Sequence, residues 1–333
     1  MKVDRHELQK RLLAVSPGLT SGKDPVQGDC VVIKAGRFYT FNGEVACSIV
    51  SGLPQDLKCA VQAKAFTDLM KKLTEKELDL SVDKGQIILA GNKRKYKLNT
   101  EAEIFLPVDS VERPKDWVKI DSAWPEAVDL VVRCTDKKGE FAQKCVHVHP
   151  HWLEASDNNK LARWTMDTFV AKSVLVRGTT LAEIVPLGVT KGCETAQWLH
   201  FHNPFGLRIS LRKWPEENYP PLDEFLEVRG ERIVFPKSIA TAAALAGTML
   251  DEKDGSVRME LTQNQLLITS RGCIGESEAQ QDIAYEGREL AFLIPPKLIA
   301  ELVETNTECE VSEVSLRVDG GTYVYLTSLE MQS

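Results

Sequence analysis

The sequence contains one strand-helix segment three times, and this repetition constrains the fold more than any other feature. The three copies are VQAKAFTDLMKKL (61–73), VLVRGTTLAEIVPL (174–187) and LIPPKLIAELV (293–303). Each copy contains an apolar residue, a small residue and an acid followed by two apolar residues, and the acids are Asp68, Glu183 and Glu301. A spacing of about 115 residues is too long for a solenoid repeat and suits a small domain. We therefore predict three tandem copies of one fold.

Each copy is predicted to be an α+β domain with two helices and antiparallel strands. A helix over 4–15 is expected from its apolar spacing and from the capping-box residues Asp4 and Glu7. The first helix of the second copy is expected over 123–134. In the third copy, a single strand over 311–318 is expected to pair with 322–326.

Proline-rich stretches near residues 107–115 and 214–229 interrupt this pattern. Helices and strands rarely continue through such stretches, so they mark the ends of the copies. We therefore place the domains at residues 1–110, 111–226 and 227–333.

Composition places the chain among ordinary globular proteins, with 43% hydrophobic residues and 27% charged residues in 333. A net charge of −7 argues against a general polycation that coats nucleic acid, but not against a basic surface on one face. The N-terminus is charged and no apolar run is long enough to span a bilayer, so we expect a cytoplasmic protein without membrane contact. The eight cysteines are scattered singly, which indicates reduced, buried thiols.

Catalytic signatures are scarce, and we expect neither an enzyme nor a cofactor. The stretch 18–24 resembles a phosphate loop, but it has three residues between its glycines instead of four. Two histidine pairs, His147 with His149 and His200 with His202, alternate along strands and could bracket a zinc ion. A solvated sheet face explains the same alternation. A metal-dependent enzyme is therefore kept only as an alternative.

Basic residues recur at matching places in successive copies of an acidic protein. Each one alone is best explained as a solvated surface charge. Together they suggest that like-charged helices face one common cavity. The basic residues on or beside the predicted helices that carry this prediction are Arg5, Lys10, Arg11, Lys71, Lys72, Arg133, Lys137 and Lys138.

The threefold pattern resembles the bacterial DNA sliding clamp, the β subunit of DNA polymerase III. The likeness covers nearly the whole chain and is most specific in the three repeated segments. Residues 153–162 (LEASDNNKLA) are similar to that family's strand and Ala-Thr-Asp-Gly-x-Arg-Leu-Ala turn, and 218–226 (NYPPLDEFL) to its Phe-Pro-Asp-Tyr linker. The 285–287 turn and the terminal strand 322–326 also match.

The resemblance implies three DNA-clamp domains per chain and a homodimer that closes head to tail into a ring around double-stranded DNA. It implies a processivity factor that tethers a DNA polymerase after a clamp loader has placed it on DNA. Helical cations would then contact phosphates without reading bases. By the same resemblance, Lys23, Lys137 and Lys138 occupy places where family members contact DNA.

The family captures short peptides of its partners in a hydrophobic pocket between its second and third domains. The resemblance implies that the pocket wall here is formed by Ser156, Asn158, Asn159, Lys160, Leu161, Leu226, Val324 and Leu326. Without the resemblance, the leucines and the valine in this set are core residues.

The sequence also departs from the family pattern. Asn158 replaces a glycine, and Thr327-Ser328 replaces a Met-Pro ending. Asparagine can still adopt the left-handed conformation of a glycine turn. The altered ending suggests a different peptide preference and a divergent, phage-like replication system. A clamp-like scaffold for repair or nuclease partners is the alternative within the binding class.

Overall fold

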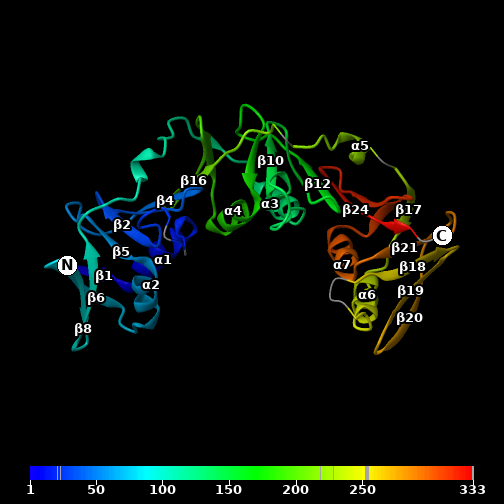
Figure 1. Cartoon of the computed structure of the whole chain (residues 1–333), viewed down its shortest axis with the longest axis horizontal. Helices are drawn as coiled ribbons and strands as arrows, with labels where there is room; N and C mark the ends of the chain where they lie inside the picture. The colour runs from blue at the N-terminus through cyan, green and yellow to red at the C-terminus, as the bar shows by residue number, and fades with distance from the viewer. Residues whose placement is uncertain (21, 23, 218, 228, 252–254, 332–333) are drawn as a thin grey trace. The chain divides into compact units, whose positions relative to one another are not determined.

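The computed structural model describes residues 1–333 except 21, 23, 218, 228, 252–254 and 332–333 (Figure 1). The chain forms two compact units. The first unit comprises Met1–Val132, His147–His151 and Asp167–Glu217, and the second comprises Arg133–Val146, Trp152–Met166 and Asn218–Ser333.

The first unit is built on a twelve-stranded sheet whose neighbouring pairs with a described register are antiparallel. In spatial order its strands are β1 (Lys2–Asp4), β6 (Glu77–Asp83), β7 (Gln86–Gly91), β8 (Arg94–Glu101), β5 (Cys59–Gln62), β2 (Cys30–Lys34), β3 (Arg37–Phe41), β4 (Val45–Val50), β16 (Arg208–Arg212), β15 (Trp198–His202), β14 (Lys191–Glu194) and β9 (Val118–Lys119). Its helices are α1 (Arg5–Ala14), η1 (Ser16–Gly18), α2 (Ala63–Lys72), η2 (Val108–Ser110), α3 (Trp124–Val132), α4 (Gly178–Ile184) and η4 (Val185–Leu187), and β13 (Val174–Arg177) precedes α4.

Helices α1 and α2 pack side by side on one face of this sheet. Phe66 and Met70 of α2 are completely buried, and Phe66 meets Phe38 of β3 edge to face at 6.4 Å between ring centroids. The predicted start of α1 is confirmed, because the Asp4 carboxylate accepts a hydrogen bond from the N–H of Glu7 at 3.0 Å.

The face of the sheet opposite α1 and α2 is covered by the chain segment 104–117, which follows β8. Ile104, Leu106, Val108 and Val111 of that segment pack on a small apolar cluster of the sheet. The ring of Phe41 lies 6.1 Å from that of Trp198 in this cluster. We call this the helix-free face of the first unit.

The second unit contains two groups of antiparallel strands and the helices η3 (Ala142–Lys144), α5 (Asp223–Leu226), α6 (Ile239–Gly247) and α7 (Pro296–Thr305). One group runs β11 (Trp152–Ser156), β12 (Lys160–Thr165), β24 (Tyr323–Ser328), β23 (Ser315–Asp319), β22 (Glu308–Val311) and β17 (Glu231–Val234). The other runs β20 (Gly275–Asp282), β19 (Gln265–Gly272), β18 (Val257–Thr262), β21 (Leu290–Ile294) and β25 (Glu330–Met331). The strand β10 (Cys145–His149) has residues in both units.

The predicted strand over 311–318 is wrong as a single element. The chain turns at Ser312–Ser315, where the Ser312 N–H donates to the Ser315 carbonyl at 2.8 Å, and β22 and β23 pair with each other. The predicted hairpin across 319–321 is confirmed, since Asp319 lies opposite Val324.

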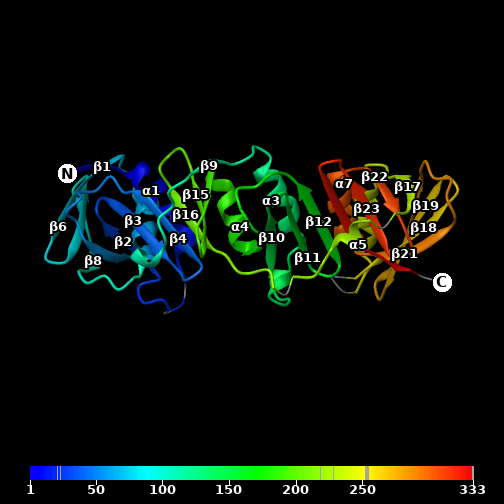
Figure 2. The same cartoon turned by 90° about the horizontal axis from the view of Figure 1, so that it is seen from above.

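Helices pack in three pairs: α1 with α2, α3 with α4, and α6 with α7. Figure 2 shows α3 beside α4, and each repeated segment supplies the second helix of a pair. The boundaries at residues 110 and 226 remain a prediction. All eight cysteines are free, and seven of them are buried. In the described part of the chain, no helix is both long and apolar enough to cross a membrane.

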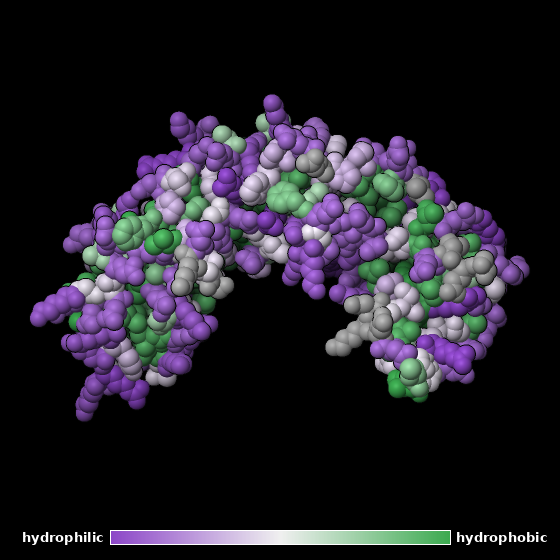
Figure 3. Space-filling view, in the orientation of Figure 1, coloured by the Kyte–Doolittle hydropathy of each residue, from purple (hydrophilic) through white to green (hydrophobic). Residues whose placement is uncertain are grey.

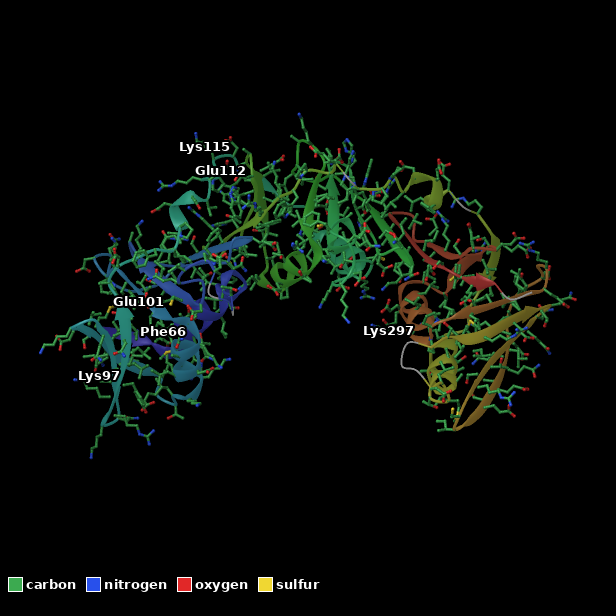
Figure 4. All side chains as sticks on the ribbon, viewed as in Figure 1. Phe66, Lys97, Glu101, Glu112, Lys115 and Lys297 are labelled. Carbon is green, nitrogen blue, oxygen red and sulfur yellow. The ribbon has the colours of Figure 1, made fainter. Side chains whose placement is uncertain are left out.

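We expect Phe66→Ala to lower the free energy of unfolding of the first unit by about 3–5 kcal/mol, because a fully buried ring is replaced by a cavity. Urea unfolding followed by fluorescence measures this loss. Phe105→Ala is the matched control, since that ring is 57% exposed and its loss should cost less than about 0.5 kcal/mol. Figure 4 labels Phe66. Equal losses for both variants would contradict the packing.

Candidate nucleic-acid interface and partner site

Several exposed cations of the first unit lie on its helices, in addition to those on its strands and loops. Lys71 and Lys72 form the last turn of α2, where the helix dipole favours positive charge, and both are exposed. Lys10 on α1 is exposed, and its ammonium lies 4.7 Å from the centroid of the Phe205 ring. Within the described residues, no carboxylate pairs with Lys10, Lys71 or Lys72. These three ammonium groups are therefore available to phosphates.

Arg11 is half-buried, and its guanidinium lies 3.8 Å from the Glu7 carboxylate on the same helix. Such a pair on a helix surface is weak, so Arg11 can exchange Glu7 for another anion.

The prediction that Arg5 lies on the exposed side of α1 is wrong. Arg5 is 7% exposed, and its guanidinium donates to the carbonyls of Met70 and Glu75 at 3.0 Å each. Met70 belongs to the last turn of α2, whose carbonyls have no partner within the helix. Arg5 therefore stabilises the contact between α1 and α2 and is not available at the surface.

Three further predicted DNA contacts follow α3 in the sequence and belong to the second unit. Arg133, Lys137 and Lys138 are exposed, and the N–H of Lys138 donates to the Asp136 carboxylate at 2.8 Å. The carbonyl of Arg133 accepts a hydrogen bond from the ammonium of Lys160 at 2.6 Å. Lys23 lies outside the described residues.

The predicted partner site lies where β12 pairs with β24 in the second unit. Leu161 stands opposite Leu326, and Arg163 stands opposite Val324, so these four side chains share one face. The other face carries Tyr325, whose hydroxyl lies 3.5 Å from the carboxylate of Glu301 in α7. The Leu161 face is therefore opposite to α7, and we use the name helix-free face for it as well, because the only helix beside it among the described residues is the single turn α5.

The side chains on this face differ in how far they are exposed. Leu161 and Leu326 are 3% and 8% exposed, whereas Val324 and Leu226 are half-buried. Phe225 on α5 is 55% exposed. In Figure 3 apolar residues reach the surface where α5 and β24 lie in the second unit.

The turn before β12 has the geometry expected from its sequence. Asn158 has φ +74°, which confirms the left-handed conformation, and the Asp157 carboxylate accepts the N–H groups of Asn159 and Lys160. The carbonyl of Asn159 accepts the N–H of Ser328 at 2.8 Å. Ser156 is half-buried at the strand end that precedes this turn. The turn is thereby fixed against the end of β24.

Lys160 does not share the face of Leu161. Its ammonium donates to the Arg133 carbonyl and lies 3.7 Å from the Glu301 carboxylate, on the helix side of the sheet. It fixes the turn to the neighbouring helices and contributes no wall to the apolar face.

Sequence reasoning missed Arg163, which connects three elements of this site. Its guanidinium pairs with Glu154 of β11 at 2.5 Å and with Asp223 of α5 at 2.6 Å, and it lies 4.6 Å from the Trp152 ring centroid. The signal was available, because Arg163 alternates with Leu161 and stands opposite Glu154 in the β11–β12 hairpin. Arg163 holds α5 beside the apolar face.

The histidine pairs have structural partners. His200 is 1% exposed, and its ring bonds Ser210 at 2.7 Å and Thr195 at 2.9 Å, so the expected solvated position is wrong for it. His147 is also buried and lies 2.8 Å from the Glu216 carboxylate. The ring of His202 contacts that of Trp117 at a tilt of 55°, with 5.5 Å between the ring centroids. Within the described residues, no three His, Cys, Asp or Glu side chains are grouped to hold a metal ion.

Comparison with known proteins gives the fold. No family model and no curated protein matches the sequence. Solved structures that match include a putative DNA polymerase III β subunit from Eubacterium rectale (TM-score 0.84, 14% identity, 98% of each chain covered) and the DNA polymerase III β subunit from Thermotoga maritima (0.84, 16%, 100% and 99%). The DNA polymerase sliding clamp from Bacillus subtilis matches at 0.84 and 15%, with 100% and 99% covered. The chain therefore has the sliding-clamp fold, and the predicted fold class is confirmed.

We expect the stability of the first unit to depend on pH through His200. Burial lowers the pKa of His200 to about 4 from its ordinary 6.5, partly opposed by the nearby Glu112 carboxylate. Between those values the unfolded chain binds a proton that the folded chain does not, so stability falls as pH falls from 6.5 towards 4. The slope is at most about 1.4 kcal/mol per pH unit.

His200→Gln removes this titration, so its urea midpoint should change less than that of the wild type over this pH range. Midpoints measured between pH 7 and 4.5 test this. Phe105→Ala serves as the control and should keep the wild-type slope. If the urea midpoints of wild type and His200→Gln changed equally with pH, burial of His200 would not be the cause of the pH dependence.

Proposed function

We propose that the protein is a DNA sliding clamp, a processivity factor that encircles duplex DNA and performs no catalysis of its own. The observation that carries this proposal is that the clamp fold extends over the whole chain, with 98–100% of it covered by the matching structures. Two copies would close head to tail into a ring in the cytoplasm. A clamp loader would open the ring, and a DNA polymerase would be the tethered partner.

The charge distribution supports contact with phosphates. Lys10, Lys71 and Lys72 are exposed on α1 and α2 without carboxylate partners among the described residues, although the chain has net charge −7. Flexible lysines at a helix surface bind phosphates by charge and carry no base readout. Weak contacts of this kind let a closed ring move along DNA, because topology and not affinity retains it.

A closed ring enters linear DNA through a free end, so no loader is needed to test topology. Bead-tethered duplex is incubated with the protein and its free end is then blocked with streptavidin. We expect the protein to survive washing on blocked DNA and to leave unblocked DNA. Equal retention on both would contradict encirclement.

Charge reversal tests the DNA surface in the same assay. Lys71→Glu with Lys72→Glu should reduce about tenfold the amount of protein found on blocked DNA, because weaker attraction to phosphates lets fewer rings thread before the end is blocked. It should also lower the salt dependence of this loading by about two phosphate contacts. Lys95→Glu with Lys97→Glu makes the same charge change at exposed positions of β8 and should leave retention near the wild-type value. Figure 4 labels Lys97. Equal losses of DNA-bound protein in both double variants would contradict a specific contact between α2 and DNA.

We infer that partner peptides bind on the Leu161 face of the second unit. Leu161 and Leu326 supply a buried apolar floor, and half-buried Val324 and Leu226 supply its accessible edge. The pairing of Arg163 with Asp223 holds α5 in place before a peptide arrives, which reduces the entropic cost of binding. The exposed ring of Phe225 adds apolar surface to the same helix.

Peptides selected on the wild-type protein from a random display library provide the test. Val324→Asp places a charge at the accessible edge and should weaken the selected apolar peptides at least tenfold, as fluorescence anisotropy measures. Val314→Asp, at a 59% exposed valine in the same unit, is the matched control and should bind like wild type. Undiminished binding by Val324→Asp would place the peptide site elsewhere.

A further inference from the structure

The first unit repeats the strand arrangement of the proposed peptide site. In the second unit, β12 of the hairpin β11–β12 pairs with β24. In the first unit, β4 of the hairpin β3–β4 pairs with β16. In both places an interrupting segment of chain lies on the helix-free face: α5 in the second unit, and residues 104–117 in the first. The two places are equivalent in the repeat, but their side chains differ.

A cavity of about 320 Å³ opens between the segment 108–117 and the helix-free face of β3, β4, β15 and β16. Lys34 pairs with Asp109 at 2.7 Å, and the Glu112 carboxylate accepts the N–H of Gln197 at 3.2 Å. The Trp117 ring contacts the His202 ring at a tilt at the end of the segment. These contacts hold the segment in place, and Figure 4 shows Glu112 and Lys115 on it.

The cavity is lined by three arginines, Arg37, Arg113 and Arg208, together with Tyr39 and Trp117. None of the arginines has a carboxylate partner among the described residues. Arg37 donates only to oxygen atoms of Ser48 and Gly206, at 3.2–3.3 Å. The lining contains these three arginines but only two acids, Asp109 and Glu112, and Asp109 is paired with Lys34, so positive charge is in excess.

The cations of this face also act on one another. Burial lowers the pKa of Arg37, and the charge of Arg208 lowers it further. The pKa of His202 is lowered by burial and then by Arg208, Lys191 and Arg37. An incoming anion would relieve this repulsion, and arginine is well suited to bind carboxylates with two parallel hydrogen bonds.

We propose that this cavity is a second docking site, for an acidic linear segment of a partner protein. Its carboxylates bind Arg37 and Arg208, and an apolar side chain of the segment packs beside Tyr39 and Trp117. The proposal takes from the proposed function only the idea that partners present linear segments. Two carboxylates of the segment match two of the three arginines that line the cavity, Arg37 and Arg208, and the third, Arg113, also has no carboxylate partner among the described residues.

The probe is a fluorescein-labelled hexapeptide with four acidic residues around one phenylalanine and one leucine. Its control replaces the acids by their amides. We expect wild type to bind the acidic peptide and the amide peptide to bind at least tenfold more weakly. Equal affinity for the two peptides, or preference for a labelled oligothymidylate of twelve nucleotides over the acidic peptide, would overturn the proposal.

Arg208→Gln is the main variant, because Arg208 is exposed and its guanidinium donates no hydrogen bond within the described residues. It should weaken the acidic peptide about tenfold, the loss expected for one charge-assisted contact. Arg212→Gln, an exposed arginine on the same strand outside the cavity lining, is the matched control and should not weaken it. Unchanged binding by Arg208→Gln would refute the site.

Two further measurements separate this proposal from the sliding-clamp function. Val324→Asp should keep its affinity for the acidic peptide, and Arg208→Gln should keep end-dependent retention on DNA. Loss of acidic-peptide binding in Val324→Asp would show that the peptide uses the Leu161 face and would overturn the second site. If the wild-type protein were not retained on end-blocked DNA, the sliding-clamp function would be contradicted. Binding of the acidic peptide would still support the second docking site.

Discussion

Pairing of strands between successive repeats is the constraint on which both proposed partner sites depend. A sheet that ends in an unpaired strand leaves a row of N–H and C=O groups without partners. In the first unit β4 avoids this by pairing with β16, and in the second unit β12 does so by pairing with β24. Each pairing forms a sheet with helices on one face and a linking segment on the other. The linking segment of the first unit bounds its cavity, and in the second unit α5 lies beside the Leu161 face on which peptides are proposed to bind.

The helices on the opposite face are positioned by their own buried contacts, which decide which cations remain for DNA. Arg5 donates to one carbonyl in the last turn of α2 and to another in the loop that follows it, and these contacts orient α1 against α2. Lys71 and Lys72 lie in the same last turn but on its solvent side. The cost of burying Arg5 is offset by its several hydrogen bonds, whereas a lysine at a solvated helix end keeps its charge available.

The repeated segment made the fold predictable, since three amphipathic helices at domain-length spacing restrict the architecture strongly. The single residues were less predictable. Helical spacing placed Arg5 outside because it contains no information about a neighbouring helix end. The turn at 312–314 was missed because Ser-Glu-Val lacks the glycine or proline that marks most turns. Alternation gave the correct face for His200, but it could not reveal that a distant segment covers that face.

The two helix-free faces show that the repeat copied geometry without copying chemistry. Opposite positions of β12 and β24 carry Leu161 with Leu326, while those of β4 and β16 carry Ser48 with Arg208. An apolar pair gains free energy from any nonpolar side chain and discriminates little by charge, whereas an unpaired arginine favours carboxylates. Two faces of opposite character would let one chain hold two different segments without competition. Selectivity between partners would then arise from the strand residues, because the strand pairing is common to both faces.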